Sequence, residues 1–232
     1  MEHRPVGEAG SSVRDFGHVV RDVLIVEDHP LMCEALSMTL ATAFGLARVR
    51  CVTSLAAAEA SIRTDGVPDA VVLDLNLPDV KGVEGVISLK ARALGAPLTV
   101  ISAEVSADMV SAVMGAGACG YISKSLPHDE MVDAFRRMWN GETVLPEGHE
   151  DDADSSGEMA VLAQGFSSLT PQQLNILRLI CQGRPNKIIS YELSIAEATV
   201  KTHITAIMSK INARRRTQAV LLANSVRLFA PT

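Results

Sequence analysis

The sequence predicts an α/β fold, namely a five-stranded doubly wound parallel sheet followed by a small all-α helix-turn-helix domain. Two observations predict it. Short apolar runs rich in β-branched residues alternate with helical patterns over the first 140 residues, which is typical of a parallel sheet covered on both faces. Only helical periodicity and tight turns follow from about residue 169 onward.

The alternating elements can be placed along the chain from their hydrophobic patterns. The expected strands are 22–27, 47–52, 69–74, 98–102 and 119–123. The expected helices between them are 31–43, 54–63, 82–94, 106–115 and 128–140. Five β-α units of this length predict one sheet with helices on each side.

The chain divides into four expected segments. Residues 1–20 are unpatterned and predict a flexible N-terminal tail, and 21–140 hold the β-α units. Residues 141–168 contain seven acids and no Lys or Arg, which predicts a flexible acidic linker with at most a short helix near 159–164. Residues 169–232 form the helical domain.

Charge is divided unequally between these segments. The net charge is −6, but nine Lys and Arg face only two acids from Leu169 onward, so that part carries +7 and the remainder −13. A basic C-terminal part predicts a polyanionic partner, although solvated helices also carry such charge. The four cysteines form no CxxC pair, and no apolar run has the roughly 18 residues of a membrane span. We therefore expect a cytoplasmic protein with reduced thiols and no membrane partner.

Acidic residues follow two of the predicted strands. Glu27 and Asp28 come after the first, and Asp74 ends the third. The carboxyl ends of parallel strands are where ligands bind, and clustered carboxylates are hard oxygen ligands of the kind that Mg²⁺ prefers. Asp74 alone could equally cap a turn, but the joint pattern favours a metal site.

Two further strand ends carry polar groups. Ser102 ends the fourth strand, and Tyr121 and Lys124 belong to the end of the fifth. A carboxylate nucleophile, a metal site, a hydroxyl donor and a fixed ammonium group are what phosphoryl transfer onto Asp74 requires. Each residue taken singly also fits a strand cap, a core aromatic or a solvated charge.

The C-terminal part begins with a helix start signal. Thr170 can cap, Pro171 suits the first helical position and Gln173 can complete a capping box, while Gly183 ends that helix. Helices 186–193 and 197–211 follow, and the second has an apolar face opposite a polar, basic face. This arrangement suits insertion into a DNA major groove, although a helical interaction domain with a solvated face has the same periodicity.

Residues 22–140 resemble the receiver domain of two-component response regulators. The stretches that carry the resemblance are Val-Glu27-Asp28-His29-Pro30, Leu-Asp74-Leu-Asn-Leu-Pro78, Ile-Ser102-Ala and Gly117-Ala-Cys-Gly120-Tyr121-Ile-Ser-Lys124. The resemblance implies a flavodoxin-like fold that accepts a phosphoryl group from a sensor histidine kinase. It implies these roles: Asp74 as phosphoacceptor, Glu27 and Asp28 as the acidic Mg²⁺ site, the backbone carbonyl of Asn76 as a further metal ligand, Ser102 as switch hydroxyl, Tyr121 as rotating aromatic and Lys124 as phosphate-binding cation.

Residues 169 to about 226 resemble the LuxR-type helix-turn-helix, so the whole chain is similar to the NarL/FixJ group. The resemblance rests on Leu169-Thr170-Pro171, Asn186-Lys187, Thr199-Val200-Lys201-Thr202-His203 and Arg216-Thr217-Gln218-Ala219, among others. It implies contacts with double-stranded DNA from Lys201, Thr202 and Thr205, and phosphate contacts from Lys187, Thr199, Arg214, Arg215 and Arg216. Ala196 and Ile188 depart from the family pattern, where a capping Ser and a polar residue are usual.

The sequence therefore predicts a phosphorylation-dependent transcriptional regulator that binds DNA as a homodimer and catalyses only its own phosphotransfer and dephosphorylation. A phosphatase working through an aspartyl-phosphate is disfavoured, because Asn76 stands where such enzymes need a general acid. A small-molecule-sensing regulator is disfavoured by the low aromatic content. A receiver-containing protein-interaction regulator with weak or lost DNA binding stays open because of Ala196 and Ile188.

Overall fold

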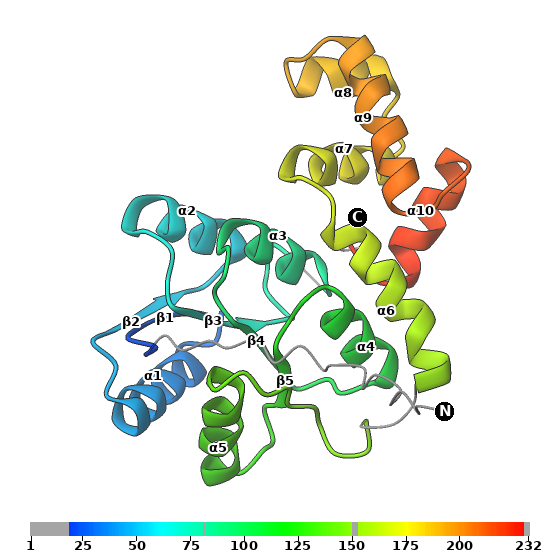
Figure 1. Ribbon diagram of the computed structural model, residues 1–232. Coiled ribbons are helices and arrows are strands. Elements are labelled where there is room, and N and C mark those ends of the chain that lie inside the picture. The colour runs from blue at the N-terminus through cyan, green and yellow to red at the C-terminus, as the bar shows by residue number, and fades with distance from the viewer. Residues whose placement is uncertain (1–18, 81, 150–152, 230–232) are drawn as a thin grey trace, which may run out of the picture.

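The protein contains one parallel sheet and a separate set of helices. The computed structural model describes residues 19–80, 82–149 and 153–229, so the expected tail at 1–20 lies almost wholly outside the described residues. The strands are β1 (Asp22–Val26), β2 (Arg48–Val52), β3 (Ala70–Asp74), β4 (Leu98–Ser102) and β5 (Gly120–Ser123). They pair in parallel in the order β2-β1-β3-β4-β5 (Figure 1). The predicted fold class is confirmed, and each strand is placed within one residue of its predicted bounds.

Five helices cover this sheet. They are α1 (Pro30–Phe44), α2 (Leu55–Asp65), α3 (Glu84–Arg92), α4 (Ala107–Gly115) and α5 (His128–Trp139). Helices α1 and α5 lie on one face and α2, α3 and α4 on the other (Figure 1). Alternate residues along β1 serve the two faces, because Val23 packs into the cluster under α1 and α5 while Leu24 packs into the opposite one. This two-sided burial explains why the inner strands β1, β3 and β4 are mostly apolar, whereas the edge strand β2 carries Arg48 and Arg50.

The segment that joins the sheet to the C-terminal helices is more ordered than the sequence predicts. Helix α6 spans Ala153–Ser167, whereas the expectation was a flexible linker with a short helix at 159–164. Helix α6 packs against α4 and α3, and Ala163 and Phe166 are fully buried there. Burial of these side chains stabilises a helix that its two glycines, Gly157 and Gly165, would otherwise weaken.

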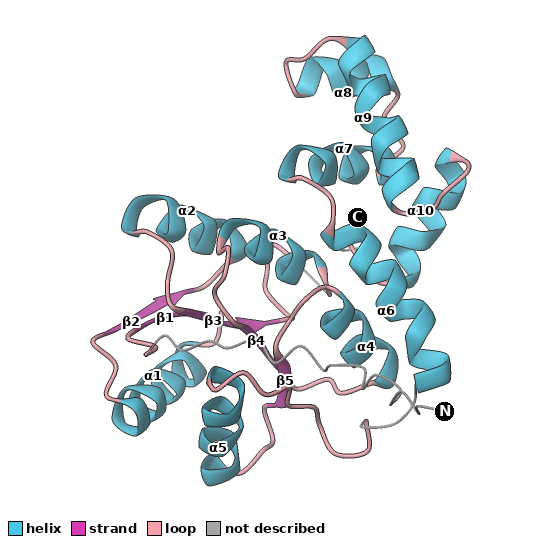
Figure 2. Cartoon of the chain, in the orientation of Figure 1, coloured by secondary structure: helices cyan, strands magenta, loops and turns pink. Residues whose placement is uncertain are grey.

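Four further helices follow within the described residues (Figure 2). They are α7 (Pro171–Cys181), α8 (Asn186–Glu192), α9 (Glu197–Lys210) and α10 (Arg216–Ser225). The predicted capping box is present, since Gln173 N donates to Thr170 Oγ1 at 3.2 Å and Thr170 N donates to Gln173 Oε1 at 3.1 Å. Gly183 follows α7 with φ 76°, as its predicted role at the helix end requires.

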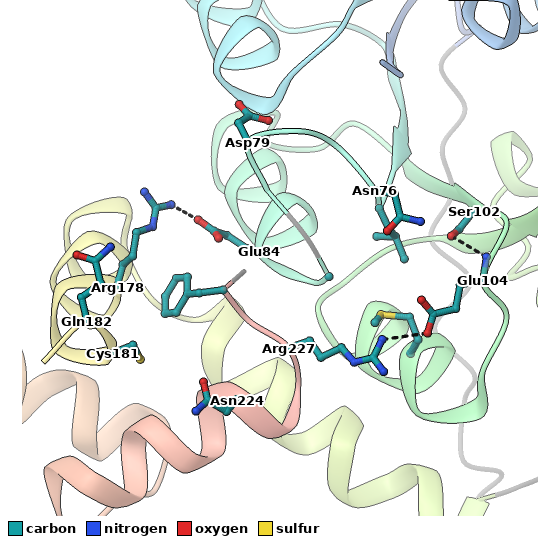
Figure 3. Close-up of a pocket in the computed structure, with 14 residues that line it drawn as sticks. Asn76, Asp79, Glu84, Ser102, Glu104, Arg178, Cys181, Gln182, Asn224 and Arg227 are labelled. Carbon is teal, nitrogen blue, oxygen red and sulfur yellow. Dashed lines mark hydrogen bonds and ion pairs between the residues drawn. The ribbon is translucent and has the colours of Figure 1, made fainter. Parts of the chain in front are cut away.

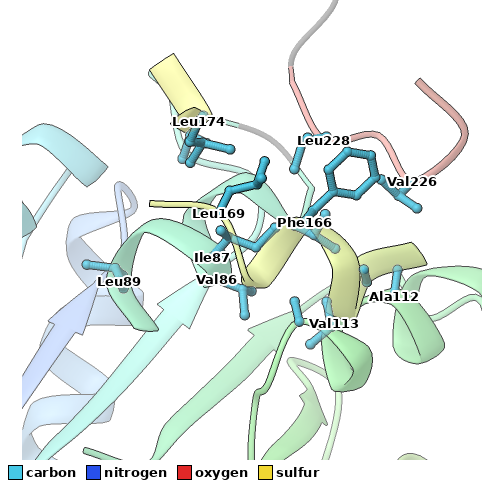
Figure 4. Close-up of a cluster of buried hydrophobic side chains, with 14 of the residues drawn as sticks. Val86, Ile87, Leu89, Ala112, Val113, Phe166, Leu169, Leu174, Val226 and Leu228 are labelled. Atoms are coloured by element: carbon cyan, nitrogen blue, oxygen red, sulfur yellow. The ribbon is translucent and has the colours of Figure 1, made fainter. Parts of the chain in front are cut away.

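The sheet and the C-terminal helices share one continuous apolar core. Phe166 of α6 lies among Val86 of α3, Val113 of α4 and Leu228 beyond α10 (Figure 4). The close packing of α4 on α6 depends on Gly115, where an added Cβ would lie only 2.4 Å from the Ala160 carbonyl oxygen. Helix α6 therefore lies between the two parts of the molecule and shares a buried apolar cluster with both.

Among the helices of the described residues, none combines the length and apolar character needed to cross a bilayer.

Candidate functional site

Three carboxylates and one imidazole gather at the carboxyl edge of the sheet. Glu27 and Asp28 follow β1, and Asp74 ends the neighbouring strand β3. One ligand atom from each of Glu27, Asp28, His29 and Asp74 can be chosen so that all lie within 4.8 Å of one another. The chain departs from β1 and β3 toward opposite faces of the sheet, so this position is the topological switch point at which such folds bind ligands.

Lys124 joins this cluster from the loop after β5. Its Nζ lies 2.6 Å from Glu27 Oε2 and 2.9 Å from Asp74 Oδ2. Both carboxylates are buried, so the ammonium group neutralises charge that water reaches poorly. Burial lowers the pKa of Lys124, but the hydrogen bonds to Glu27 and Asp74 outweigh it and raise the pKa. The predicted cation is thus a charged group held against the predicted nucleophile.

The acidic residues fit a hard divalent ion. Within the described residues, Glu27 Oε2 and Asp28 Oδ1 are buried oxygens whose close neighbours are Lys124 Nζ, at 2.6 Å, and His29 Nδ1, at 2.9 Å. Buried carboxylates are costly unless positive charge offsets them, and a bound cation adds to that charge. Asn76 N donates to Asp74 Oδ1 at 3.3 Å, so the residue whose carbonyl is the predicted further ligand lies next to the same carboxylate.

Ser102 and Tyr121 converge on the loop after β4. Glu104 N donates to Ser102 Oγ at 3.2 Å, and the Tyr121 hydroxyl donates to the Glu104 carbonyl oxygen. Tyr121 is only 1% exposed, and burial raises the pKa of its hydroxyl. The structure therefore brings together the two predicted switch residues, and it does so through the backbone of Glu104.

Glu104 also contacts the C-terminal part, which the sequence did not indicate. Its Oε1 lies 2.9 Å from Arg227 Nη1, just beyond α10. Glu84 and Arg178 form a second ion pair between the two parts (Figure 3). Acids in an exposed loop or at the start of a helix are common, so nothing in the pattern of residues distinguishes these two.

The two ion pairs flank a cavity of about 730 Å³ between the sheet and the C-terminal helices (Figure 3). Asn76 and Ser102 line it from the sheet edge, and Cys181 and Asn224 line it from α7 and α10. The cavity thus extends from the neighbourhood of Asp74 to the helices of the C-terminal part.

The residues predicted to contact DNA lie on the outer surface of the C-terminal helices. All but one of them are exposed: Lys187, Thr199, Lys201, Thr202, Thr205, Arg214 and Arg215. Arg216 is half-buried instead, and its guanidinium donates to the Arg184 carbonyl and to Asn186 Oδ1. Arg216 therefore braces the start of α10 against the α7–α8 turn, while its predicted phosphate contact stays untested.

The polar face of α9 has two local features of note. Val200 and Ile207 are buried on the inner face, which leaves Lys201, Thr202 and Thr205 outward as the amphipathic pattern predicts. Ala196 is the residue before the helix and provides no side-chain hydrogen bond to its free N–H groups. The docked arrangement leaves this polar face open to solvent.

Comparison with known proteins agrees with the geometry. Residues 23–136 match the family described as response regulator receiver domain, and residues 167–223 match the luxR family of bacterial regulatory proteins. The glycerol metabolism activator of Pseudomonas putida is 34% identical over 88% of this chain and 95% of its own length. The nitrate/nitrite response regulator NarL of Escherichia coli K12 is 29% identical over 89% and 96%.

Among solved structures, a structure of two RcsB dimers bound to two parallel DNAs covers 89% of this chain and 99% of its own. Its TM-score is 0.52 and its identity 18%, so this likeness shows the fold alone. The curated relatives align over nearly the full chain, with both parts in the same order. The chain therefore belongs to the response regulators that join a receiver domain to a luxR-type DNA-binding domain.

Proposed function

We propose that this response regulator accepts a phosphoryl group on Asp74 from a phosphohistidine of a sensor histidine kinase and thereby changes its binding to promoter DNA. The observation that carries the proposal is the position of Lys124, whose Nζ bridges Glu27 and Asp74 at 2.6 and 2.9 Å. An aspartate held beside an ammonium group and an acidic metal site has the nucleophile and the positive charge that phosphoryl transfer needs.

The residues of the chain take separate parts in this reaction. Asp74 supplies the attacking carboxylate oxygen, and Lys124 stays paired with the oxygens that gain negative charge. Glu27, Asp28, Asp74 and the Asn76 carbonyl would hold Mg²⁺, which neutralises charge on the transferred group. Ser102, whose Oγ accepts from Glu104 N at 3.2 Å, would exchange that bond for one to the phosphoryl group.

That exchange links the phosphoryl group to the C-terminal part. Glu104 donates its N–H to Ser102 Oγ and accepts the Tyr121 hydroxyl on its carbonyl oxygen. Its carboxylate forms an ion pair with Arg227. Movement of Ser102 toward a phosphoryl group therefore disturbs the loop that holds Arg227. We infer that phosphorylation loosens the junction between the two parts.

The output is binding to double-stranded DNA through the exposed face of α9. Because Lys201, Thr202 and Thr205 are already exposed in the docked arrangement, phosphorylation acts by freeing the orientation of the helices rather than by uncovering them. Two freed copies can then align on paired half-sites. Leu221 of α10, 69% exposed, is the apolar side chain we assign to the contact between them.

The regulator's other attributes follow from these partners. It acts in the cytoplasm, where DNA and the catalytic domain of a sensor kinase are both accessible. Its catalysis is limited to its own phosphotransfer and dephosphorylation, because Asn76 gives no acid beside Asp74 to speed hydrolysis. The receiver spans 21–140, the acidic connection 141–168 and the DNA-binding domain 169–232.

The test is a DNA-shift titration with a duplex selected from a random library by the phosphorylated protein. Wild type and Asp74→Asn are compared with and without acetyl phosphate and Mg²⁺. Wild type gains affinity and the mass of one phosphoryl group, whereas Asp74→Asn gains neither and Asp129→Asn, an exposed acid on α5, behaves as wild type.

Charge reversal tests the DNA surface separately. Lys201→Glu abolishes binding in both states, because it places repulsion against the phosphates on the recognition face. Retained binding by this variant moves the DNA site elsewhere, and a failed selection with intact phosphorylation favours the protein-interaction regulator.

A further inference from the structure

His29 stands at the entrance of the acidic cluster and belongs to it geometrically. It is the residue before α1, with φ −90° and ψ 110°, and Pro30 fixes the first position of the helix. Its backbone N–H lies 3.2 Å from Glu27 Oε1, and its ring Nδ1 lies 2.9 Å from the same oxygen. The Nδ1 atom is also 2.9 Å from Asp28 Oδ1.

We propose that His29 Nδ1 is a ligand to the divalent ion at this site. The site therefore binds Zn²⁺ in preference to Mg²⁺, and bound Zn²⁺ inhibits phosphorylation of Asp74. The proposal rests on the metal site of the proposed function and adds a nitrogen ligand and a competing ion to it.

The spacing of the atoms supports shared coordination. Adjacent ligands at about 2.1 Å from one ion lie about 3 to 3.4 Å apart, depending on whether the geometry is octahedral or tetrahedral. The two 2.9 Å separations from His29 Nδ1 are close to that range before any adjustment to a metal. The two carboxylates each keep a second oxygen, and for Glu27 that oxygen is the one next to Lys124.

The buried oxygens make the cluster more than a group of surface acids. The Glu27 side chain is fully buried, and Lys124 Nζ lies 2.6 Å from its Oε2. Glu27 Oε1 and Asp28 Oδ1 instead face His29 Nδ1, each at 2.9 Å. His29 is 68% exposed, so an ion can enter past the ring and still meet a buried ligand behind it. A site with an open entrance and three carboxylates against one lysine in its interior is suited to an exchangeable ion.

The ligand chemistry determines which ion is favoured. Imidazole nitrogen suits Zn²⁺, whereas Mg²⁺ prefers oxygen ligands and retains several waters. Glu27, Asp28, His29 and Asp74 together offer the four ligands that close a tetrahedral zinc shell. A closed shell leaves no position for a phosphoryl oxygen, so Zn²⁺ competes with the ion that phosphorylation uses.

The test compares Zn²⁺ and Mg²⁺ binding to the full-length protein by titration calorimetry. His29→Asn is expected to lower Zn²⁺ affinity at least about tenfold while changing Mg²⁺ affinity little, because only Zn²⁺ gains from the nitrogen. His128→Asn removes an exposed imidazole that pairs with Asp129 at 3.2 Å outside the cluster, and it should leave both affinities unchanged. Co²⁺ is the spectroscopic substitute, with the intense visible absorption of four-coordinate cobalt in wild type and its loss in His29→Asn.

The outcomes separate this inference from the proposed function. If His29→Asn keeps the Zn²⁺ affinity and the cobalt absorption of wild type, His29 is not a ligand and the inference is wrong. In that case Mg²⁺ binding and phosphorylation can still stand. If Asp28→Asn and Asp74→Asn both leave Mg²⁺ binding unchanged, the proposed metal site itself is wrong.

Discussion

Glu104 and Arg227 connect the loop after β4 to the segment after α10 through an ion pair of 2.9 Å. The same Glu104 accepts the Tyr121 hydroxyl on its carbonyl oxygen and donates its N–H to Ser102. One loop residue therefore contacts both predicted switch side chains and the C-terminal part.

Removing the charge of Arg227 should favour separation of the two parts. Arg227 is 65% exposed in its side chain, so its ion pair contributes at most about 1 kcal/mol, which is roughly a fivefold change in the equilibrium. Arg227→Gln should raise the affinity of the unphosphorylated protein for paired half-sites by up to that factor, measured by DNA shift. Arg48→Gln, which breaks an ion pair of 3.5 Å with Asp65 far from the junction, serves as control. Equal effects of the two variants would show that the junction is not involved.

The ion pair of Arg178 with Glu84 should stabilise the junction between the two parts more than the ion pair of Arg227 with Glu104. Glu84 is 5% exposed, so Arg178→Gln leaves a buried carboxylate without its partner. We expect a loss of about 1.5 to 3 kcal/mol from the junction, typical of a hydrogen bond to a charged group. Limited proteolysis after α6 should become faster in this variant. The double variant Arg178→Gln with Glu84→Gln should recover part of the loss. No recovery would assign the effect to the Arg178 guanidinium, which also lies over the Phe229 ring, 5.7 Å from its centroid.

Gly82 provides a steric test of the same junction. It has φ 67°, and a Cβ there would lie 2.3 Å from the Arg227 carbonyl oxygen. Gly95 has φ 88° and no atom within 4 Å of the corresponding position, so Gly95→Ala carries the backbone strain of about 1 to 2 kcal/mol without the clash. Both variants should lower the melting temperature, but only Gly82→Ala should raise the DNA affinity of the unphosphorylated protein. An equal rise in Gly95→Ala would show that the effect comes from general destabilisation.

Cys181 can report on opening of the junction. It lines the cavity, and burial raises the pKa of its thiol from 9.0 to about 11. At pH 8 its thiolate fraction is therefore about a hundredfold below that of an ordinary thiol, and its alkylation rises as pH increases toward the folded pKa. Acetyl phosphate with Mg²⁺ should accelerate alkylation of Cys181 by iodoacetamide at fixed pH, followed peptide by peptide in a mass spectrometer. The exposed Cys51 is the internal reference, whose rate should stay constant.

Ala196 offers a stabilising substitution. It precedes α9 without a side-chain hydrogen bond, and its φ of −64° and ψ of 145° suit a capping residue. Ala196→Ser should stabilise the C-terminal domain by about 1 kcal/mol, measured by denaturant unfolding. DNA affinity should stay the same or rise slightly, because the cap stabilises the first turn of α9, the helix that carries Lys201. An unchanged midpoint would mean that the N–H groups at this helix start are already well solvated.

The sheet and its edge were predictable, because the signals there are local. Apolar runs predict the strands, and polar residues at the ends of four of these runs predict the site, so the sequence alone singles out Asp74 and Lys124. Their roles in catalysis stay predictions until the phosphorylated aspartate is observed. The predicted helix-turn-helix follows in the same way from a capping box and an amphipathic pattern.

The junction was not predictable for a physical reason. Helix α6 has weak periodicity and two glycines, so its stability depends on packing against elements distant in the sequence, such as α3 and α4. Glu84 and Glu104 look like ordinary surface acids until the partner arginines, 94 and 123 residues further along the chain, are placed beside them. Contacts of this kind depend on the tertiary arrangement and leave no pattern in one sequence.

Helix α6 also determines how the molecule can meet DNA. Fifteen residues of helix make a rod about 22 Å long. If α6 stays helical after activation, each DNA-binding domain of a bound dimer remains at a fixed distance from its receiver domain. The length of α6 then limits the spacing between DNA half-sites that the dimer can bind. Changing that spacing by half a helical turn of the duplex should weaken binding.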